Sequence, residues 1–447
     1  MGSARGVVGH DEGVASVTRG GGWRAFEEPL RNFFGSGRFA NSLSLVIVGA
    51  AFSTFAIIRT VAWPGLVGAL ATLVVLATIS FIARRGRHDS HGLLPISLIV
   101  FVGWCTISVF WSENPATTIA SSLYQLAWAY LAIYLAMVRD TIQVVRVVGD
   151  VLRFLLAGSL ALEVFSGLVA SEPVHYLGVS GTIAHFGPIQ GIFGSRNALA
   201  LISVIALVTF FVEWRTRSVT RGRAALSLPL AAISLALSRS PVAVAVIALV
   251  IVAALFLVLL RSIRDERRRF SVQLTLAVLS VVAAAAAWVL RDPIIGLLDA
   301  RSMLNVRHEL WIQMWDFSRQ NPLVGWGWTG IWRGDEFPFS LINAYAGTPE
   351  SNGLNAYLDV LLQLGWAGVL VFGVLVVLAL GRSWLVASNK RSVIHTWTPL
   401  VLLAVLATSA TESVALVDYG WVLLVICTVN ASQNMSWRSA VPASTTR

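Results

Sequence analysis

The sequence alternates apolar runs of about 20 residues with short segments rich in arginine. A run of roughly 20 apolar residues is long enough to cross the hydrocarbon of a bilayer as a helix. Of the 447 residues, 56% are hydrophobic and only 13% are charged, whereas soluble domains carry about 25% charged residues. This pattern predicts an all-α integral membrane protein.

Twelve apolar runs are candidate transmembrane helices. They lie at residues 39–58, 62–82, 92–110, 118–137, 150–169, 197–213, 224–238, 241–260, 271–290, 356–380, 397–411 and 417–431. The seventh and eighth are almost continuous, and the sequence SRSP at 238–241 separates them. A proline after polar residues predicts an interruption of the helix at that point. We therefore expect about twelve transmembrane helices in a polytopic domain at 39–431.

Basic residues are divided unequally between the two sides that this alternation defines. One side holds the tail 1–38, every second loop and the C-terminal tail 432–447, and it carries 25 of the 33 basic residues. Loops that stay in the cytoplasm have an excess of Lys and Arg. We therefore expect both termini in the cytoplasm, and the long loops 170–196 and 291–355 on the extracytoplasmic side.

Several functional classes are disfavoured. The net charge of +10 comes from basic loops between spans, so we expect no nucleic-acid partner. Cys105 and Cys427 lie inside apolar runs, which argues against a disulfide or a cysteine metal site. There is no phosphate-binding glycine loop, and the histidine pair His88 and His91 lies in a basic cytoplasmic loop. We expect no metal and no cofactor.

The second long loop holds the most polar stretch, RHELWIQMWDFSRQNPLVGWGWTGIW at 307–332. Its first part has apolar positions at helical spacing, and its Pro and alternating Gly residues mark a turn. We expect short amphipathic helices at the outer membrane surface. The side chains of Trp326, Trp328 and Trp332 have two interpretations, as anchors at the membrane interface or as surfaces on which sugars stack.

Three arginines on the extracytoplasmic side are candidate anion ligands. Arg239 lies between two apolar runs, where an ion site and snorkelling to head groups are both possible. Arg307 is four residues before Trp311, so on a helix the ring can brace the guanidinium. Arg196, followed by Asn197, lies where a loop meets a span. Together they suit a phosphate or diphosphate, which guanidinium groups bind through paired hydrogen bonds.

A polar patch begins the tenth span. Asn355, Asp359 and Gln363 are spaced to share one face of a helix. Polar side chains on a membrane helix are expected to face the protein interior. Either a functional role or simple packing through hydrogen bonds explains them.

These stretches resemble the O-antigen ligase and O-antigen polymerase superfamily of bacterial membrane glycosyltransferases. The resemblance rests on GIFGSRNALA at 191–200, LSRSPVAVAV at 237–246, the stretch 307–332, and LNAYLDVLLQLGWAG at 354–368. It implies a metal-independent, inverting transferase in the bacterial cytoplasmic membrane. The donor would be a polyprenyl-diphosphate-linked glycan, and the acceptor a hydroxyl of a glycan or lipid, at the extracytoplasmic face.

The resemblance also implies site residues. Arg239 and Arg307 match the positions of arginines for the diphosphate, and Asn355 and Tyr357 belong to the family's Asn-x-Tyr-Leu motif. The family usually has His before this Asn, but here the residue is Leu354, which cannot accept a proton. The candidate bases nearby are Glu350, His308 and Asp359.

Three alternatives stay open from the sequence. Polymerase and ligase differ only in the acceptor, and no residue decides between them. A polytopic transporter or flippase would carry charges on broken helices at mid-membrane, for which Arg239 and Asp359 are the available candidates. A non-catalytic homologue that binds lipid-linked glycan would account for Leu354.

Overall fold

The computed structural model describes residues 29–84, 94–170, 172–290, 301–347 and 349–434, together with Pro293 and Gly296. Most of the tails 1–38 and 432–447, and the pair His88 and His91, lie outside these residues. The regular elements of these residues are helices, and Val174 and Val179 form an isolated antiparallel β-bridge. The predicted all-α class is confirmed.

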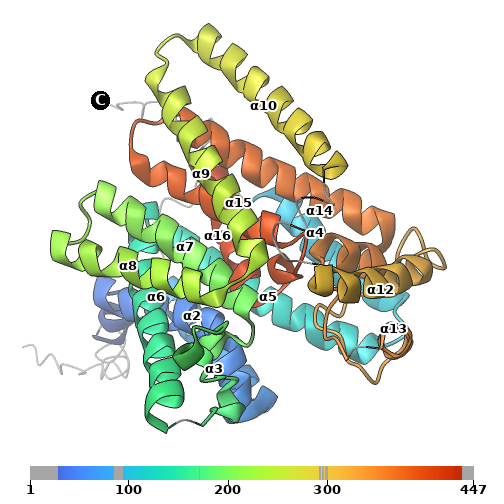
Figure 1. Cartoon of the computed structure of the whole chain (residues 1–447). Helices are drawn as coiled ribbons and strands as arrows, with labels where there is room; N and C mark the ends of the chain where they lie inside the picture. The colour runs from blue at the N-terminus through green and yellow to red at the C-terminus, as the bar shows by residue number, and fades with distance from the viewer. Residues whose placement is uncertain are drawn as a thin grey trace, which may run out of the picture.

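Helices of very different length make up the described chain (Figure 1). They are α2 (Gly37–Phe52), α3 (Thr54–Ala83), α4 (Ile96–Ile107), α5 (Pro115–Val138), α6 (Thr141–Val164), α7 (Arg196–Arg215), α8 (Arg221–Ser238), α9 (Pro241–Ser262), α10 (Glu266–Val289), α12 (Arg301–Ser318), α13 (Phe339–Ala346), α14 (Ala356–Asn389), α15 (Trp397–Thr408) and α16 (Asp418–Asn434).

Six helices of the described residues are long and apolar enough to cross a membrane. They are Thr54–Ala83, Pro115–Val138, Thr141–Ala170, Arg196–Arg215, Pro241–Ser262 and Ala356–Asn389. The apolar helices Gly37–Phe52, Ile96–Phe110 and Val393–Thr408 are shorter. A multi-pass membrane protein is therefore supported, while the count of twelve spans stays a prediction.

Several predicted boundaries were wrong. The first helix ends at Phe52 rather than at 58, and α3 begins at Thr54 and is kinked at Ala62, just before Pro64. Proline cannot donate its backbone nitrogen to the preceding turn, which explains a kink there. Helix α6 begins at Thr141, nine residues before the predicted span, because helical hydrogen bonding continues into polar sequence that hydropathy excludes.

The predicted interruption at 238–241 is confirmed. Helix α8 ends at Ser238, and Arg239 adopts a left-handed conformation with φ 45°. The Ser240 side chain then caps α9 by accepting the N–H of Ala243 (3.3 Å). Pro241 occupies the first turn of α9, where no N–H is needed.

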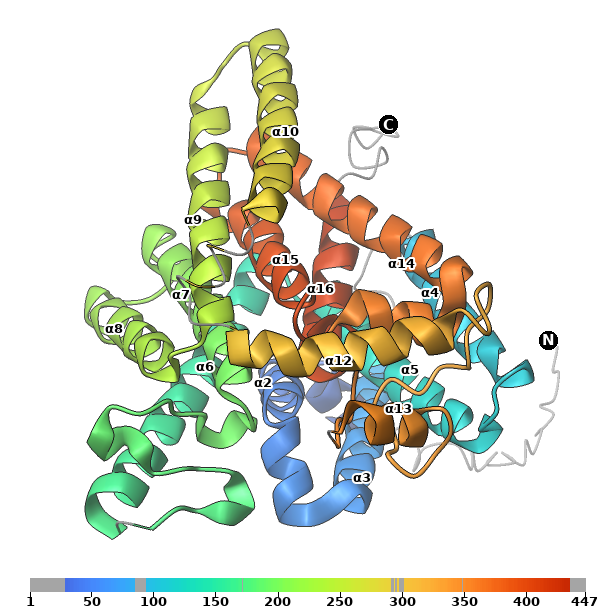
Figure 2. The same cartoon turned by 45° about the vertical axis from the view of Figure 1, so that its right-hand side comes forward.

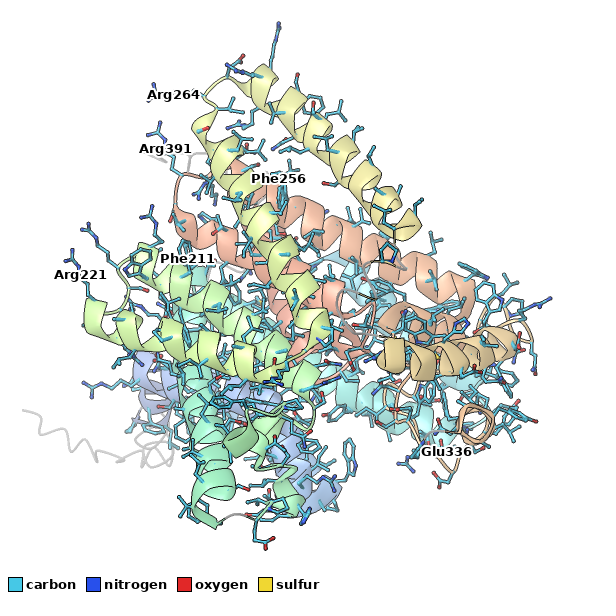
Figure 3. The ribbon with its side chains drawn as sticks, viewed as in Figure 1. Phe211, Arg221, Phe256, Arg264, Glu336 and Arg391 are labelled. Atoms are coloured by element: carbon cyan, nitrogen blue, oxygen red, sulfur yellow. The ribbon has the colours of Figure 1, made fainter. Side chains whose placement is uncertain are left out.

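The basic loops gather at one end of the helical bundle. Figure 3 labels Arg221 at the start of α8, Arg264 between α9 and α10, and Arg391 after α14, and the three lie on the same side of the molecule. Glu336, from the segment between α12 and α13, lies at the opposite end. The separation agrees with the unequal division of basic residues between two faces.

A continuous apolar core fills the bundle. Its largest fully buried side chains include Trp128 of α5, Trp397 of α15 and Trp421 of α16. Helix α12 runs across the front of the molecule in Figure 2, with α13 below it, and it packs against α13 and α14; α10 lies at the edge of the molecule beside α9. A second apolar cluster, with Leu310 and Met314 at its centre, joins α12 and α13 to α14.

Candidate functional site

Helix α14 is interrupted near its start, and the loop after α12 fits into the interruption. Gly365 has a φ of 65°, outside the helical range, so neighbouring backbone groups of α14 need partners elsewhere. Backbone hydrogen bonds join the two segments from Trp326 to Leu362 (3.1 Å), from Gly327 to Gln363 (2.8 Å), from Trp366 to Pro322 (2.8 Å) and from Ala367 to Leu323 (3.2 Å). The motifs NPLVGWG and LGWAG are therefore two halves of one structural unit.

Glycine is required on both sides of this contact. Gly325 has a φ of 69°, and a Cβ there would lie 2.5 Å from the backbone carbon of Gln363. A Cβ on Gly365 would lie 2.3 Å from the backbone carbon of Leu323. Such distances are far below van der Waals contact, and positive φ is itself costly for other residues. The sequence pattern of alternating glycines follows from this close approach.

Two polar side chains of α14 hold the tryptophan-rich segment. The Oε1 atom of Gln363 accepts the backbone N–H groups of Thr329 and Gly330, both at 2.9 Å. Asp359 accepts the Trp332 indole N–H and the Gly353 N–H, both at 2.8 Å, and the Ser413 hydroxyl. These bonds satisfy polar groups that are fully buried. The polar face of the tenth span thus fixes the loop in place.

The tryptophans of this segment are buried inside the protein. Trp326, Trp328 and Trp332 are only 8%, 1% and 3% exposed. The interpretation of these three as anchors at the membrane interface was wrong, because their rings pack inside the protein: Trp326 against Phe317 and Phe337, Trp328 against Phe101 and Trp332 against Phe339. Trp315, on the outer face of α12, is 46% exposed.

Four segments meet at Glu412. This residue lies between α15 and α16, and its Oε1 atom accepts from Arg307 Nη2 (2.7 Å) and from Asn197 Nδ2 (2.6 Å). The Oδ1 atom of Asn197 accepts the hydroxyl of Ser240 (2.7 Å). Arg307 Nε also donates to the carbonyl of Thr411 (3.2 Å). The starts of α7 and α9, helix α12 and the α15–α16 loop are thus joined by side chains.

This network brings together residues that the sequence analysis selected from separate motifs. Arg307 is 6% exposed and Asn197 is 7% exposed. Arg239 is exposed and directly precedes Ser240 of the network, while Arg196 directly precedes Asn197. Arg239 and Arg307 therefore lie in one region of the molecule.

Glu350 lies close enough to interact with the charged pair. Burial raises its pKa above the ordinary value for Glu, and the Arg307 guanidinium acts in the opposite direction. Burial also raises the pKa of Glu412, which Arg307 and Asn197 partly offset and Glu350 increases further. The charge of Arg307 thus acts on the carboxyl groups of both Glu350 and Glu412. Burial favours the neutral form of both carboxyl groups, whereas the charge of Arg307 favours their ionised form.

The remaining predicted residues lie around this centre. Trp311 donates its indole N–H to the Gly353 carbonyl (2.9 Å). His308, the next residue after Arg307, is exposed on α12. Asn355 caps α14 by accepting the N–H groups of Tyr357 and Leu358 (3.0 and 3.1 Å), and the Tyr357 hydroxyl donates to the Leu406 carbonyl (3.0 Å).

Leu354 stands out in its backbone. It has a φ of 47°, which is uncommon for a residue other than Gly. Its N–H donates to the Asn352 side chain (2.9 Å), and its side chain packs against the second apolar cluster. Local strain of this kind is concentrated at functional sites.

Sequence reasoning missed Glu412. Its signal was an acidic residue in a short polar segment between the last two apolar runs. That signal alone does not say which of the distant arginines it meets. Among the residues that the structure describes, no cluster of three or more His, Cys, Asp or Glu side chains is placed to hold a metal ion.

The comparison with known families bears on this site. Residues 224–373 match the family described as O-antigen ligase. The match covers 150 of the 447 residues and includes Arg239, Arg307 and the first part of α14 with its interruption at Gly365. No curated protein matches the chain.

The similarity of residues 224–373 to the O-antigen ligase family points to a coarse class of function. It implies a glycosyltransferase-type activity in a membrane, with a lipid-linked glycan and an acceptor as partners in general terms. The residues Asn197 and Glu412 lie outside the matched segment but are bonded to its Ser240 and Arg307.

Proposed function

We propose that the protein transfers a glycan from a polyprenyl diphosphate to an acceptor hydroxyl at the extracytoplasmic face of the bacterial cytoplasmic membrane, as a polymerase or a ligase of cell-surface polysaccharide. One observation carries the proposal: the network that places Arg307, Asn197 and the Arg239–Ser240 turn around Glu412. Permanently charged guanidinium groups gathered in a partly buried site suit a diphosphate.

The charges of the site match the charge that develops in such a reaction. The acceptor oxygen forms a bond to the anomeric carbon while the bond from that carbon to the diphosphate oxygen breaks. Negative charge then accumulates on the departing polyprenyl diphosphate. Arg307 and Arg239 stabilise it as fixed cations, and the reaction needs no metal for this purpose. Attack from the face opposite the leaving group inverts the anomeric configuration.

Among the candidate bases we assign proton transfer to Glu350. The acceptor hydroxyl must lose its proton as it attacks, and a general base works best when its pKa is near the working pH. Burial raises the pKa of Glu350, and Arg307 lies within its electrostatic range. His308 is exposed beside the site. Asp359 is already engaged by buried hydrogen bonds, so we assign it a positioning role.

The test is release of polyprenyl diphosphate from purified protein, lipid-linked glycan and acceptor, with a chelator present. We expect Arg307→Ala to lower the rate by about 10²–10³-fold, the usual cost of removing one group that stabilises transition-state charge. Arg319→Ala is the matched control, because Arg319 follows the same helix and is exposed; its rate should equal that of the wild type. Equal rates for both variants would refute the proposal.

A second candidate function is favoured by Leu354. A protein that binds lipid-linked glycan without transferring it has no need for the proton acceptor that the family carries at this position. Such a protein would bind the donor in the same assay, lose binding on Arg307→Ala, and release no polyprenyl diphosphate. Measuring binding and release together separates the two functions.

A further inference from the structure

A cavity of about 410 Å³ lies between α3, α5, the segment 328–333 and the start of α16. Its volume is in the range of small-molecule sites, roughly 300–1,000 Å³. Trp332 lines it and donates to Asp359, which also accepts from Ser413, the neighbour of Glu412. The cavity is therefore connected to the Arg307–Glu412 pair through the hydrogen bonds of Trp332 and Ser413 to Asp359.

Indole rings dominate the lining of this cavity. They come from three helices and the loop: Trp63, Trp128, Trp328, Trp332 and Trp421. Trp63 at the rim is 44% exposed, whereas Trp128 and Trp421 are fully buried. An indole face carries partial negative charge and packs against weakly positive C–H groups. The C–H faces of a pyranose ring present such groups, while its hydroxyl groups point outward toward polar partners.

The cavity also offers polar partners suited to hydroxyl groups. Asp418, the first residue of α16, lines it and accepts the hydroxyl of Tyr124. A carboxylate has lone pairs for further donors beyond this one. Arg333, at the rim, is the cation of the lining, and it lies 3.7 Å from Glu336. The cavity is therefore not built for a diphosphate, which needs several cations.

Three buried side chains of the lining carry polar atoms with no hydrogen-bond partner. They are both amide atoms of Gln125, Nε1 of Trp128 and Nε1 of Trp328. Gln125 is 3% exposed, and its amide has exchanged water for the thiol of Cys105, a weak hydrogen-bonding group. Buried polar groups without a partner are rare in folded proteins, because each costs about 1–3 kcal/mol. Rotation about the last torsion of Gln125, which is broad, can turn its amide toward a ligand.

We propose that this cavity binds a sugar unit of the glycan next to the reacting bond. The inference rests on the proposed function, since it places a sugar beside the diphosphate held at Arg307. A polyprenyl chain would gain from the indole surfaces but would leave the amide of Gln125 and the indole N–H of Trp328 without partners. A sugar satisfies both sets of groups.

The experiment compares two buried glutamines that differ in their partners. Gln125→Met removes the unpartnered amide at similar size. Gln363→Met is the matched control, because Gln363 accepts from Thr329 and Gly330. We expect Gln125→Met to keep or raise the melting temperature, and Gln363→Met to lower it. A buried polar group without a partner is dispensable for folding, whereas one with partners is not.

Binding is then measured with three probes in detergent or nanodiscs. The probes are bare polyprenyl diphosphate, the same lipid carrying its oligosaccharide, and the free oligosaccharide released from it. We expect Gln125→Met to weaken binding of a sugar-bearing probe about tenfold, the value of one buried hydrogen bond, and to leave bare polyprenyl diphosphate unchanged. Ser121→Trp, which fills the cavity from α5, should do the same.

The outcomes separate this inference from the proposed function. Loss on the lipid-linked probe alone identifies the donor sugar as the occupant, and loss on the free oligosaccharide identifies an acceptor sugar. Weaker binding of bare polyprenyl diphosphate would overturn the inference in favour of a lipid chain. Unchanged binding of all three probes would also overturn it, while the effect of Arg307→Ala would still stand. Failure of the wild type to bind the lipid-linked glycan would refute the proposed function itself.

Discussion

Two Arg–Glu pairs with a buried arginine occur in the described part of the chain, and they differ in what surrounds the carboxylate. Arg153 of α6 pairs with Glu213 of α7, whose side chain is 0% exposed. The guanidinium carbon of Arg153 also lies 4.6 Å from the centre of the Phe210 ring. Arg307 pairs with Glu412, which is 21% exposed. The two arginine side chains are similarly buried, because only 12% of Arg153 and 7% of Arg307 is exposed. The difference lies in whether the acid is enclosed.

The enclosed pair, Arg153 and Glu213, holds neighbouring helices together. Arg153 also donates to the Ser227 hydroxyl (2.7 Å) and to Asp150 (3.0 Å), so it joins α6 to α7 and α8. The Arg307 pair adds a second acid, Glu350, and the starts of α7 and α9. Residue type and burial of the arginine are therefore the same in the two pairs and do not tell a structural pair from a functional one. We propose that the accessible carboxylate and the neighbouring charges mark the Arg307 pair as the functional one.

The largest effect is expected at the enclosed pair. Arg153→Ala leaves the Glu213 carboxylate buried without its cation, which costs about 3–5 kcal/mol of stability. Unfolding in detergent, followed by helical circular dichroism, measures the loss. Stability equal to that of the wild type would show that the pair is not structural, and the comparison would fail.

Next in size is the loss of the assigned base. Glu350→Gln keeps size and hydrogen bonding but cannot take a proton, so we expect transfer to fall about 100-fold or more. The melting temperature should be unchanged, because Glu350 contributes its carbonyl to Asn343 and the backbone stays in place. The measurement is the single-turnover rate with saturating donor. A wild-type rate would move the role of base to another group.

The pH profile sharpens the link between the two acids and Arg307. A base must be deprotonated, so the rate should rise with pH through the pKa of Glu350, which lies above the ordinary value for Glu. Arg307 lowers that pKa, so in the residual activity of Arg307→Ala the rise should occur at higher pH. Rate profiles of both proteins between pH 4 and pH 9 test this, and a midpoint that does not move would contradict it.

A smaller effect concerns stability. Because burial raises the pKa of Glu412 in the folded state, the folded protein holds this proton more tightly than the unfolded chain. That contribution is complete below the unfolded pKa and is lost as pH rises through the folded pKa. Glu412→Gln cannot ionise, so its melting temperature should fall less than that of the wild type over this rise. Parallel curves would show that Glu412 does not titrate differently on folding.

The smallest effect is expected at an exposed pair on the basic end. Arg223 contacts Asp150 at 2.7 Å, but the two side chains are 49% and 39% exposed. Such pairs contribute about 0–1 kcal/mol. Arg223→Ala should therefore change the melting temperature little, in contrast to Arg153→Ala, which shares the same acid. A loss as large as that of Arg153→Ala would show that Asp150 matters more than burial suggests.

The sequence predicted those features that depend on neighbours along the chain. The polar break before Pro241 gave the interruption between α8 and α9, and the glycines around Gly325 predicted a turn. The interruption of α14 at Gly365, which pairs with that turn, was not predicted. Only the folded backbone shows which N–H and carbonyl groups of the two segments bond to each other.

Contacts across the bundle were the part that sequence could not supply. Arg307 was selected from its motif, whereas its counter-ion Glu412 lies 105 residues later and was missed. The tryptophans at 326–332 were read by residue type, which favours interfaces, but their burial depends on the hydrogen bonds that Asp359 and Gln363 provide. Hydropathy marks which segments are apolar, and packing decides which polar groups face each other.

The central claim is that Arg307 binds a diphosphate. The affinity of the protein for two lipids tests this claim most directly. Polyprenyl diphosphate and polyprenyl monophosphate share the chain and differ in one phosphate group. We predict that the wild type binds the diphosphate more tightly, and that Arg307→Ala loses most of this preference while its affinity for the monophosphate changes little. The same preference in both proteins would contradict the account.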